Sequence, residues 1–340
     1  MTGLLKSPTT HITGFAIAIA SLPFWLIPNS GILAIAIVAL LYAAAATAFN
    51  LTAGLGGQLS FGHSIFFGLG AYATALLRQD LGWNVWAAVP VALTIAVVAA
   101  LALALPSARL GGVYFVLVSF VATLALESIA TWASDVTGGA AGISLTVGSP
   151  APAELRFENP LGHYYVALIL LTTFLGLFAA VTRSNFGLRL RAVRDDPAAA
   201  AASGIAVARQ RTVSLLVSAA LTSLVGVAYL QYISYIDPTS AFGSMTASMI
   251  AMPALFGGLG TLWGPVLGAT VLISVQQTLN PAFSGLPAGL GLIVFGVLVM
   301  ALQTIEPKGA VHLLRSGLRH LGQRLGTSKR TAQPAGDSLT

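Results

Sequence analysis

The chain has 340 residues, of which 56% are apolar and only 8% are charged, whereas a soluble globular protein carries about 25% charged residues. Sixteen Lys and Arg with ten Asp and Glu are too few to cover the surface of a water-soluble fold of this size, so lipid must cover most of it. The composition therefore excludes a soluble protein and predicts an integral membrane protein.

Cysteine content and net charge exclude further classes. The chain has no cysteine, which excludes a disulfide framework, thiol catalysis and a cysteine-ligated metal. The net charge of +6 does not indicate nucleic acid, because the basic residues fall in loops and in the tail. We expect no metal site, no cofactor and no nucleic-acid partner.

Two long tracts without Asp, Glu, Lys or Arg, Ser7–Leu77 and Pro238–Ile305, each have room for several spans of about 20 residues. We predict an all-α, polytopic membrane fold with about ten transmembrane helices, some of them broken or re-entrant. The candidate helices are Ile12–Pro28, Gly31–Leu51, Ser64–Leu77, Val85–Pro106, Val113–Ala133, Gly162–Thr182, Thr212–Gln231, Met245–Leu259, Leu262–Leu279 and Pro287–Gln303. The third and the eighth are short for a span, so we expect them to be tilted, broken or re-entrant.

Basic residues gather on one side of these spans. Lys6, Arg109, residues 183–211 and residues 308–330 together hold 14 of the 16 basic residues. By the positive-inside rule that side is cytoplasmic, which places both termini inside and residues 134–160 outside.

Two parts of the chain follow from this pattern. We expect a transmembrane domain over residues 1–304 and a basic cytoplasmic tail over residues 305–340, part of it disordered. Ala18-Ile19-Ala20 superficially resembles a signal-peptide cleavage site, but the apolar stretch around it has the composition of any first span.

The first glycine-rich segment, Thr52–Ala71, cannot be an ordinary lipid-facing helix, because it holds six glycines among polar residues. Irregular backbone at membrane depth is tolerated only inside protein or beside a water-filled cavity. We predict a broken or re-entrant element beside a translocation path, with a tight interhelical turn at the cytoplasmic face as the alternative. The candidate path residues here are Gly56, Gly57, Gln58, Ser60, Gly62 and His63.

The second glycine-rich segment contains Gly257, Gly258, Gly260, Gly264 and Gly268. The last three repeat every four residues, which predicts one helix face that permits close approach of another helix. Close packing alone and a moving gate helix both fit this pattern. We include all five glycines among the candidate residues of the path or gate.

The cytoplasmic loop Arg183–Arg211 specifies a short helix. Asp196 can cap it, Pro197 suits its first position, five alanines favour it, and Gly204 suits its exit. A helix this short is marginal in water, so we expect it to dock against a partner; a solvated helix without a partner is the alternative. The candidate docking residues are Arg189, Arg191, Arg194, Asp195, Asp196, Pro197, Ala200 and Gly204.

Three stretches, in this order, resemble the permeases of branched-chain amino-acid ABC transporters. They are Asn50–His63 with Phe66–Tyr72, Leu190–Asp196 with Gly204-Ile205, and Gly257–Ala269. The resemblance covers roughly residues 31–304, and the long exterior loop favours the LivM-type subunit over its LivH-type partner. The chain departs from the family where Pro197 and the alanine run replace a more varied acidic helix.

The resemblance implies a type II ABC-importer-like permease in a bacterial inner membrane. A second homologous permease subunit would complete the path, two cytoplasmic ABC ATPase subunits would drive transport, and an external substrate-binding protein would deliver the solute. This chain has no Walker-type loop, so the partner ATPases, and not this chain, would hydrolyse ATP. Leucine, isoleucine and valine fit the family, but relatives carry urea, short amides or aromatic acids, so the cargo stays open.

Three other functions compete with this interpretation. A secondary transporter also has about ten spans and broken helices, but proton-coupled versions usually carry ionisable residues in the membrane, where Glu127 is the acidic candidate. A sugar-type ABC permease would share the architecture and differ in cargo. A structural membrane scaffold would not need two glycine-broken segments. His63 has no second metal ligand near it in sequence, so we expect a polar packing role.

Overall fold

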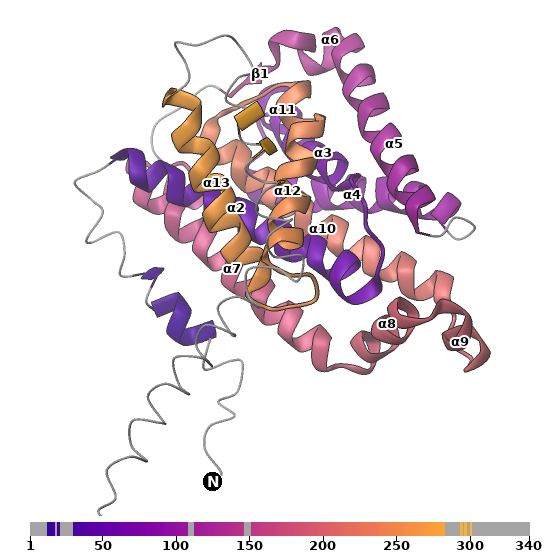
Figure 1. The fold of residues 1–340 in the computed structure, drawn as a ribbon. Helices are drawn as coiled ribbons and strands as arrows, with labels where there is room; N and C mark the ends of the chain where they lie inside the picture. The colour runs from indigo at the N-terminus through magenta and orange to yellow at the C-terminus, as the bar shows by residue number, and fades with distance from the viewer. Residues whose placement is uncertain are drawn as a thin grey trace, which may run out of the picture.

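The computed structural model describes residues 12–17, 19–20, 30–107, 112–145 and 151–282, with short helical pieces at 293–294, 296–297 and 300. Eight helices of 14 or more residues form the body of the described structure (Figure 1). They are α2 (Ser30–Asn50), α3 (His63–Leu81), α4 (Val85–Ser107), α5 (Val113–Trp132), α7 (Pro160–Arg183), α10 (Val207–Ile233), α12 (Ser244–Gly257) and α13 (Gly264–Ala282). The chain is thus all-α, as predicted.

Shorter elements connect these helices. They are a π-helical turn (Leu51–Leu55), α6 (Ser134–Thr137), α8 (Asn185–Asp195), α9 (Pro197–Ala202), α11 (Pro238–Phe242) and the 3-10 turns Gly139–Ala141 and Pro152–Glu154. Strands β1 (Ile143–Ser144) and β2 (Tyr235–Ile236) pair antiparallel, with Ile143 opposite Ile236.

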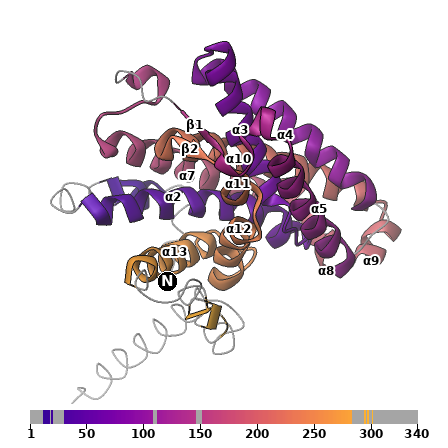
Figure 2. The same cartoon turned by 90° about the horizontal axis from the view of Figure 1, so that it is seen from above.

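Helix α2 is the centre of the fold. It packs against α7, α10, α12 and α13, and α7 and α13 lie on opposite sides of it in Figure 2. Its sequence is apolar all round, which is typical of a helix that other helices enclose. The alanines Ala43–Ala46 are buried and allow the neighbouring backbones to come close.

Helices α4 and α5 present apolar side chains outward. Val98 and Leu105 on α4 and Val121 on α5 are each at least 60% exposed, which is what a surface in contact with lipid tails requires. Three tryptophans, Trp83, Trp86 and Trp132, are exposed at the end of the bundle where α3 and α5 finish and α4 begins. Exposed tryptophans gather at the membrane–water interface, so this end marks one membrane boundary.

Five described helices are long and apolar enough to cross a membrane: α2 with its π-helical turn, α4, α5, α7 and α10. They confirm five of the predicted spans to within a few residues. The predicted helix Ser64–Leu77 is longer in the structure, because α3 runs on to Leu81. The predicted helix Met245–Leu259 is the 14-residue α12, too short to cross alone, as we expected.

The two outermost predicted helices fall partly or wholly outside the described residues. Of Ile12–Pro28, residues 12–17 and 19–20 are described and helical. Pro287–Gln303 and the basic tail 305–340 lie outside the described residues, apart from the short pieces named above.

Candidate functional site

The first glycine-rich segment is a break between α2 and α3. The α-helix ends at Asn50, the chain makes one π-helical turn, and residues 57–60 have no regular structure before α3 begins at His63. Gly57 has φ +66°, a conformation that favours glycine. The Thr52 carbonyl accepts the N–H groups of Gly56 and Gln58. The helix is therefore interrupted here, as both the broken element and the interhelical turn that we considered require. The interrupted segment is buried apart from the exposed Gly57 and the half-buried Leu59 and Phe61.

Helix α5 supplies hydrogen bonds that the broken backbone lacks. The Phe61 N–H donates to Ser119 Oγ at 3.1 Å, and Thr123 Oγ1 donates to the Phe61 carbonyl at 3.2 Å. The Gly62 N–H donates to Ser60 Oγ at 3.1 Å. Sequence reasoning missed Ser119 and Thr123; the signal that could have found them is two polar residues four positions apart in the otherwise apolar stretch 115–126 of α5.

His63 fills a polar contact between α3 and α10. Its Nε2 lies 2.7 Å from Ser218 Oγ, and its Nδ1 lies 3.2 Å from the Ser60 carbonyl. The Ser218 hydroxyl also donates to the Ala48 carbonyl on α2 at 2.6 Å. His63 is buried, and its ring packs edge to face against Phe49. Within the described ranges no group of three potential metal-ligating residues occurs. The contacts of His63 are those of a buried polar residue between α2, α3 and α10.

Helix α10 carries a buried polar stripe that the sequence analysis also missed. Its members, Gln210, Ser214, Ser218 and Thr222, recur every four residues and are all buried. Ser214 Oγ donates to the Leu51 carbonyl in the π-helical turn at 3.4 Å. The stripe therefore supports the break from the α10 side.

The second glycine-rich segment is a turn between α12 and α13. Gly258 and Gly260 have φ +112° and +76°, so neither continues a helix. Our prediction that Gly260, Gly264 and Gly268 share one helix face is wrong for Gly260, which lies in the turn before α13 begins at Gly264. The four-residue spacing was misleading because glycine occurs both where helices pack closely and where the backbone has a positive φ. Gly260 belongs to the second kind.

Gly264 and Gly268 do permit the close packing that we predicted. A Cβ on Gly268 would lie 2.7 Å from the Pro253 carbonyl carbon of α12, and one on Gly264 would lie 2.5 Å from the Gly258 oxygen. Gly257, at the end of α12, meets the Gly264 backbone in the same way. Helices α12 and α13 are thus in contact through their backbones.

The loop between α7 and α10 folds into two short helices. Asp196 Oδ1 accepts the N–H groups of Ala198 and Ala199, and Pro197 is the first residue of α9. Gly204, with φ +81°, follows the end of α9. The predicted capped helix is confirmed. It projects with α8 beyond the ends of α7 and α10 (Figures 1 and 2), and its residues are exposed apart from Ala200.

The basic residues of α8 point in different directions. Arg191 Nη2 donates to the Thr182 carbonyl at the end of α7 at 2.6 Å. Arg194 Nη1 donates to the Gly54 carbonyl in the π-helical turn. Arg189 and Asp195 are exposed. Of the predicted docking residues, Arg194 therefore contacts the break.

All three stretches singled out in the sequence meet at Gly54. Asn50 Oδ1 accepts the Gly260 N–H at 2.8 Å, and Asn50 Nδ2 donates to the Thr261 carbonyl at 2.9 Å. Arg194 reaches Gly54 from α8. A Cβ on Gly54 would collide with Asn50 Oδ1 and lie 2.5 Å from Gly260 N. We call the set Asn50, Gly54, Arg194, Gly260 and Thr261 the glycine junction.

Two buried side-chain amide oxygens, one in the break and one at the start of α10, lack partners within the described part of the chain. Gln58 Oε1 and Gln210 Oε1 have no hydrogen-bond partner among the described residues, although both residues are at least nine-tenths buried. Buried polar groups are normally satisfied. The break and the first turn of α10 therefore each retain one side-chain acceptor that no described residue uses.

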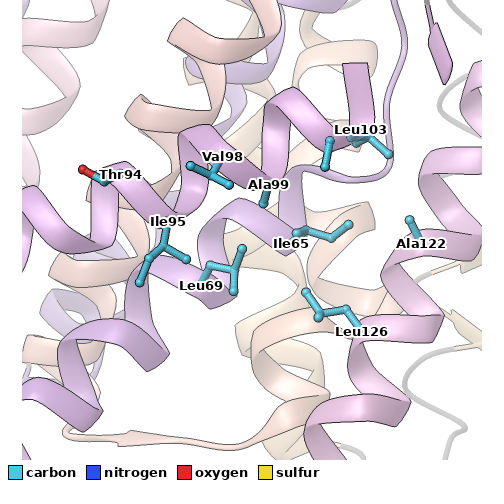
Figure 3. Close-up of a pocket in the computed structure, with 10 residues that line it drawn as sticks. Ile65, Leu69, Thr94, Ile95, Val98, Ala99, Leu103, Ala122 and Leu126 are labelled. Atoms are coloured by element: carbon cyan, nitrogen blue, oxygen red, sulfur yellow. The ribbon is translucent and has the colours of Figure 1, made fainter. Parts of the chain in front are cut away.

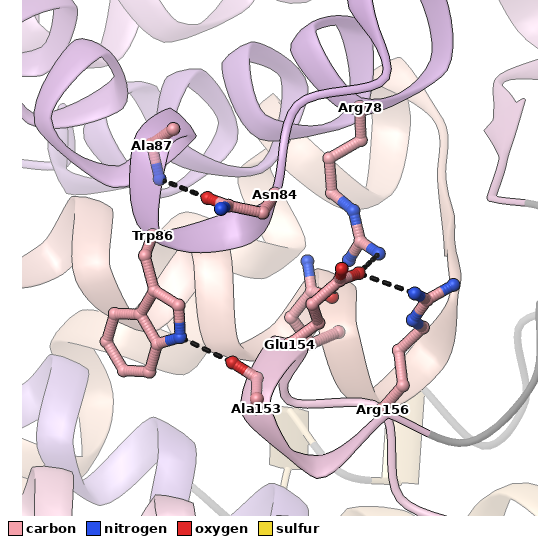
Figure 4. A network of polar contacts seen from close by, with 8 residues as sticks. Arg78, Asn84, Trp86, Ala87, Ala153, Glu154 and Arg156 are labelled. Atoms are coloured by element: carbon pink, nitrogen blue, oxygen red, sulfur yellow. Dashed lines mark hydrogen bonds and ion pairs between the residues drawn. The ribbon is translucent and has the colours of Figure 1, made fainter.

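The opposite end of the bundle is held by a separate polar network (Figure 4). Glu154 Oε2 lies 2.5 Å from Arg156 Nη2 and 3.6 Å from Arg78 Nη2, and Arg78 also donates to Gln231 of α10. Trp86 Nε1 donates to the Ala153 carbonyl at 2.6 Å. These contacts fix residues 151–156 on the ends of α3, α4 and α10. Glu127, half-buried on α5, forms no ion pair with a described residue.

A pocket of about 650 Å³ lies between α3, α4 and α5 (Figure 3). Its lining consists of Ile65, Leu69, Thr94, Ile95, Val98, Ala99, Ala102, Leu103, Ala122 and Leu126. Thr94 brings the one side-chain hydroxyl, which donates to the Pro90 carbonyl of its own helix. The pocket therefore offers hydrocarbon surface and suits a lipid tail or another apolar side chain better than a polar solute.

Comparison with known proteins gives the family. Residues 31–302 match the family described as "Branched-chain amino acid transport system / permease component". The chain is 24% identical, over 86% of its length and 72% of the relative's, to the high-affinity branched-chain amino acid transport system permease protein LivM of Escherichia coli (strain K12). It is 28% identical to the probable branched-chain amino acid transport permease protein LivH of Methanocaldococcus jannaschii, over 43% of this chain and 45% of that protein.

A more distant likeness extends to permeases with other names. The autoinducer 2 import system permease protein LsrC of Klebsiella pneumoniae is 31% identical over 42% of each chain. No solved structure gives a significant match. The match to the family covers both glycine-rich segments and the α8–α9 loop. The chain belongs to the family of permease components of branched-chain amino acid transport systems, and it is a multi-pass membrane protein.

Proposed function

We propose that this permease carries leucine, isoleucine and valine, or similar small polar solutes such as urea or amides, as a subunit of an ATP-driven importer. The name of the LivM relative supports branched-chain amino acids as the first candidates. The weaker matches to permeases named for autoinducer 2 and fructose import keep a sugar-type cargo as the second candidate.

The α8–α9 pair carries the proposal that cytoplasmic ATPases drive this subunit. Helix α9 is too short to be stable alone, yet Asp196 caps it and Pro197 starts it. Most of its alanine methyl groups are exposed. A rigid, projecting helix with an apolar surface suits insertion into a groove of another subunit. We propose that one ATPase binds here and that a second ATPase binds a homologous permease subunit.

We propose that the glycine junction belongs to the gate of the path. It joins the two glycine-rich segments, where neighbouring parts of the chain touch through their backbones. Small displacements at the junction would therefore alter how α2, α3, α12 and α13 pack. The gate residues would be those predicted from the two glycine-rich segments. In this proposal both termini and residues 183–211 face the cytoplasm, and residues 134–160 face outward to an external substrate-binding protein.

Co-purification of the ATPase subunits tests the docking proposal. Ala200→Pro places proline inside α9, which costs about 3 kcal/mol of helix stability, and we expect the ATPases to be lost from the complex. Ala206→Pro is the matched control, because Ala206 lies outside α9 and its φ of −72° fits proline. Retention of the ATPases by Ala200→Pro at equal membrane levels would refute docking through α9.

A further inference from the structure

The Arg194 side chain extends from α8 to the π-helical turn after α2. A residue that served docking alone would point away from the membrane domain. The Arg194 guanidinium donates to the Gly54 carbonyl, across the boundary between the α8–α9 loop and the broken helix. We propose that Arg194 is a positioning residue that transmits the movement of α8 and α9 to the glycine junction. This inference rests on the proposed function, because it requires a partner that moves α9.

The surroundings of Arg194 are built to hold it. A Cβ on Gly57 would lie 2.9 Å from Arg194 Cγ and 3.2 Å from its Cα, and a Cβ on Gly260 would lie 2.9 Å from its Nη1. Gly57 and Gly260 both have positive φ. Two glycines from different segments therefore leave the space through which the side chain passes, and substitution of either would displace it.

Helix α8 is coupled to the break by packing as well. Leu190 and Val193 are fully buried, and Leu190 Cδ2 would lie 3.5 Å from a Cβ on Gly56. The apolar face of α8 thus lies beneath the π-helical turn. Apolar packing resists compression but has little direction, whereas a charge-assisted hydrogen bond fixes one atom against another. The hydrogen bond of Arg194 therefore lets α8 displace the Gly54 carbonyl when α8 moves away from the break as well as when it moves toward it.

The bond reaches both halves of the junction. Gly54 lies one turn from Asn50, whose side chain holds the Gly260 N–H and the Thr261 carbonyl. A displacement of the Gly54 carbonyl must therefore shift the Asn50 contact or break it. Movement of α8 is passed in this way to the break before α3 and to the turn before α13. Arg191, which bonds back to Thr182 on the adjoining α7, cannot do this.

The test uses complexes reconstituted with the second permease, the ATPases and the binding protein, in which uptake and ATP hydrolysis are measured together. Arg194 is exposed, so Arg194→Ala should insert and fold. We expect it to keep its ATPases and their hydrolysis, while uptake per ATP falls about tenfold, the factor expected for losing a hydrogen bond to a charged group. Arg194→Lys keeps one donor for Gly54 and should recover uptake to within about threefold of the parent.

Two further arms separate this inference from a structural role and from the docking proposal. Arg209→Ala removes an exposed charge from the first turn of α10 and should leave uptake per ATP unchanged. A cysteine at Leu59, in the break, should change its labelling rate on ATP addition in the parent but not in Arg194→Ala.

The outcomes are distinct. Parental uptake per ATP in Arg194→Ala would overturn the inference, as would failure of Arg194→Lys to improve on Arg194→Ala. Loss of the ATPases from Arg194→Ala would make Arg194 a docking residue and would also overturn it, while leaving the proposed function intact. Retention of ATPases and uptake in Ala200→Pro would instead refute docking through α9.

Discussion

Asn50 and Gly260 are 210 positions apart in the chain and are joined by a hydrogen bond of 2.8 Å from the Gly260 N–H to Asn50 Oδ1. The same side chain donates to the Thr261 carbonyl. Asn50 ends α2, the central helix, and Gly260 lies in the turn before α13. One amide side chain therefore gives hydrogen-bond partners to two backbone groups of this turn, which lies outside the regular helices.

Asn50→Ala should destabilise the permease. It leaves the Gly260 N–H and the Thr261 carbonyl without these partners, at a cost of about 1–3 kcal/mol for each group that stays buried. We expect a lower unfolding temperature in detergent and a lower level of assembled complex. Thr47→Val is the control, because the buried Thr47 hydroxyl donates only to the Ala43 carbonyl of its own helix. Equal losses in both variants would contradict the role of Asn50.

Gly54→Ala should be severely destabilising although alanine favours helix. Its Cβ would collide with Asn50 Oδ1 and would lie 2.5 Å from Gly260 N. The two segments must separate to admit it. Gly176→Ala is the contrasting variant: nothing lies within 4 Å of its Cβ, so the change should stabilise α7 by about 0.5–1 kcal/mol. Thermal unfolding of the two variants side by side measures the difference, and a Gly54→Ala as stable as the parent would refute the close approach.

Gly268→Ala should push α13 away from α12. The added methyl would lie 2.7 Å from the Pro253 carbonyl carbon, which is backbone and cannot swing aside. We expect reduced assembly, and a larger reduction for Gly264→Leu. Thr270→Ala changes an exposed residue of the same helix and should assemble normally. If Gly268→Ala and Thr270→Ala behave alike, backbone contact between these helices is not needed.

The orientation can be tested with single cysteines, because the chain has none of its own. Ser203 at the end of α9 and Ser144 in β1 are both exposed and lie toward opposite ends of the bundle (Figure 1). An impermeant maleimide added to intact cells should label a cysteine at Ser144 and spare one at Ser203. The reverse pattern would contradict the proposed orientation.

Local chemistry made α9 and the broken helix predictable, whereas α8 (Asn185–Asp195) was not predicted as a helix. Asp196, Pro197 and Gly204 act on their immediate neighbours in sequence, so their cap, start and exit roles carry over unchanged to the fold. The glycines of Thr52–Ala71 likewise indicated an interruption, although two of the six, Gly68 and Gly70, lie within the regular helix α3. These elements were predicted with their boundaries nearly correct.

The meeting of the segments was not predictable in the same way. Nothing near Asn50 in sequence indicates that its amide bonds to Gly260, because the partner is set by how α2 and α13 pack. Arg194 was predicted to face an ATPase, since charge on an exposed helix suggests a partner, and its bond to Gly54 became visible only in the fold. The regular spacing of Gly260, Gly264 and Gly268 led to a wrong helix start for a related reason. The spacing of glycines alone does not show that the helix begins at Gly264, after Gly260.

The central claim is that this permease works in an importer powered by ATP. Uptake of radiolabelled leucine into proteoliposomes containing this chain, the second permease and the ATPases, with binding protein added outside and ATP inside, tests it most directly. We expect uptake that requires enclosed ATP, continues when an ionophore abolishes the proton gradient, and is inhibited by unlabelled isoleucine and valine. Uptake that proceeds without ATP and stops with the ionophore would contradict the claim and would identify a secondary transporter.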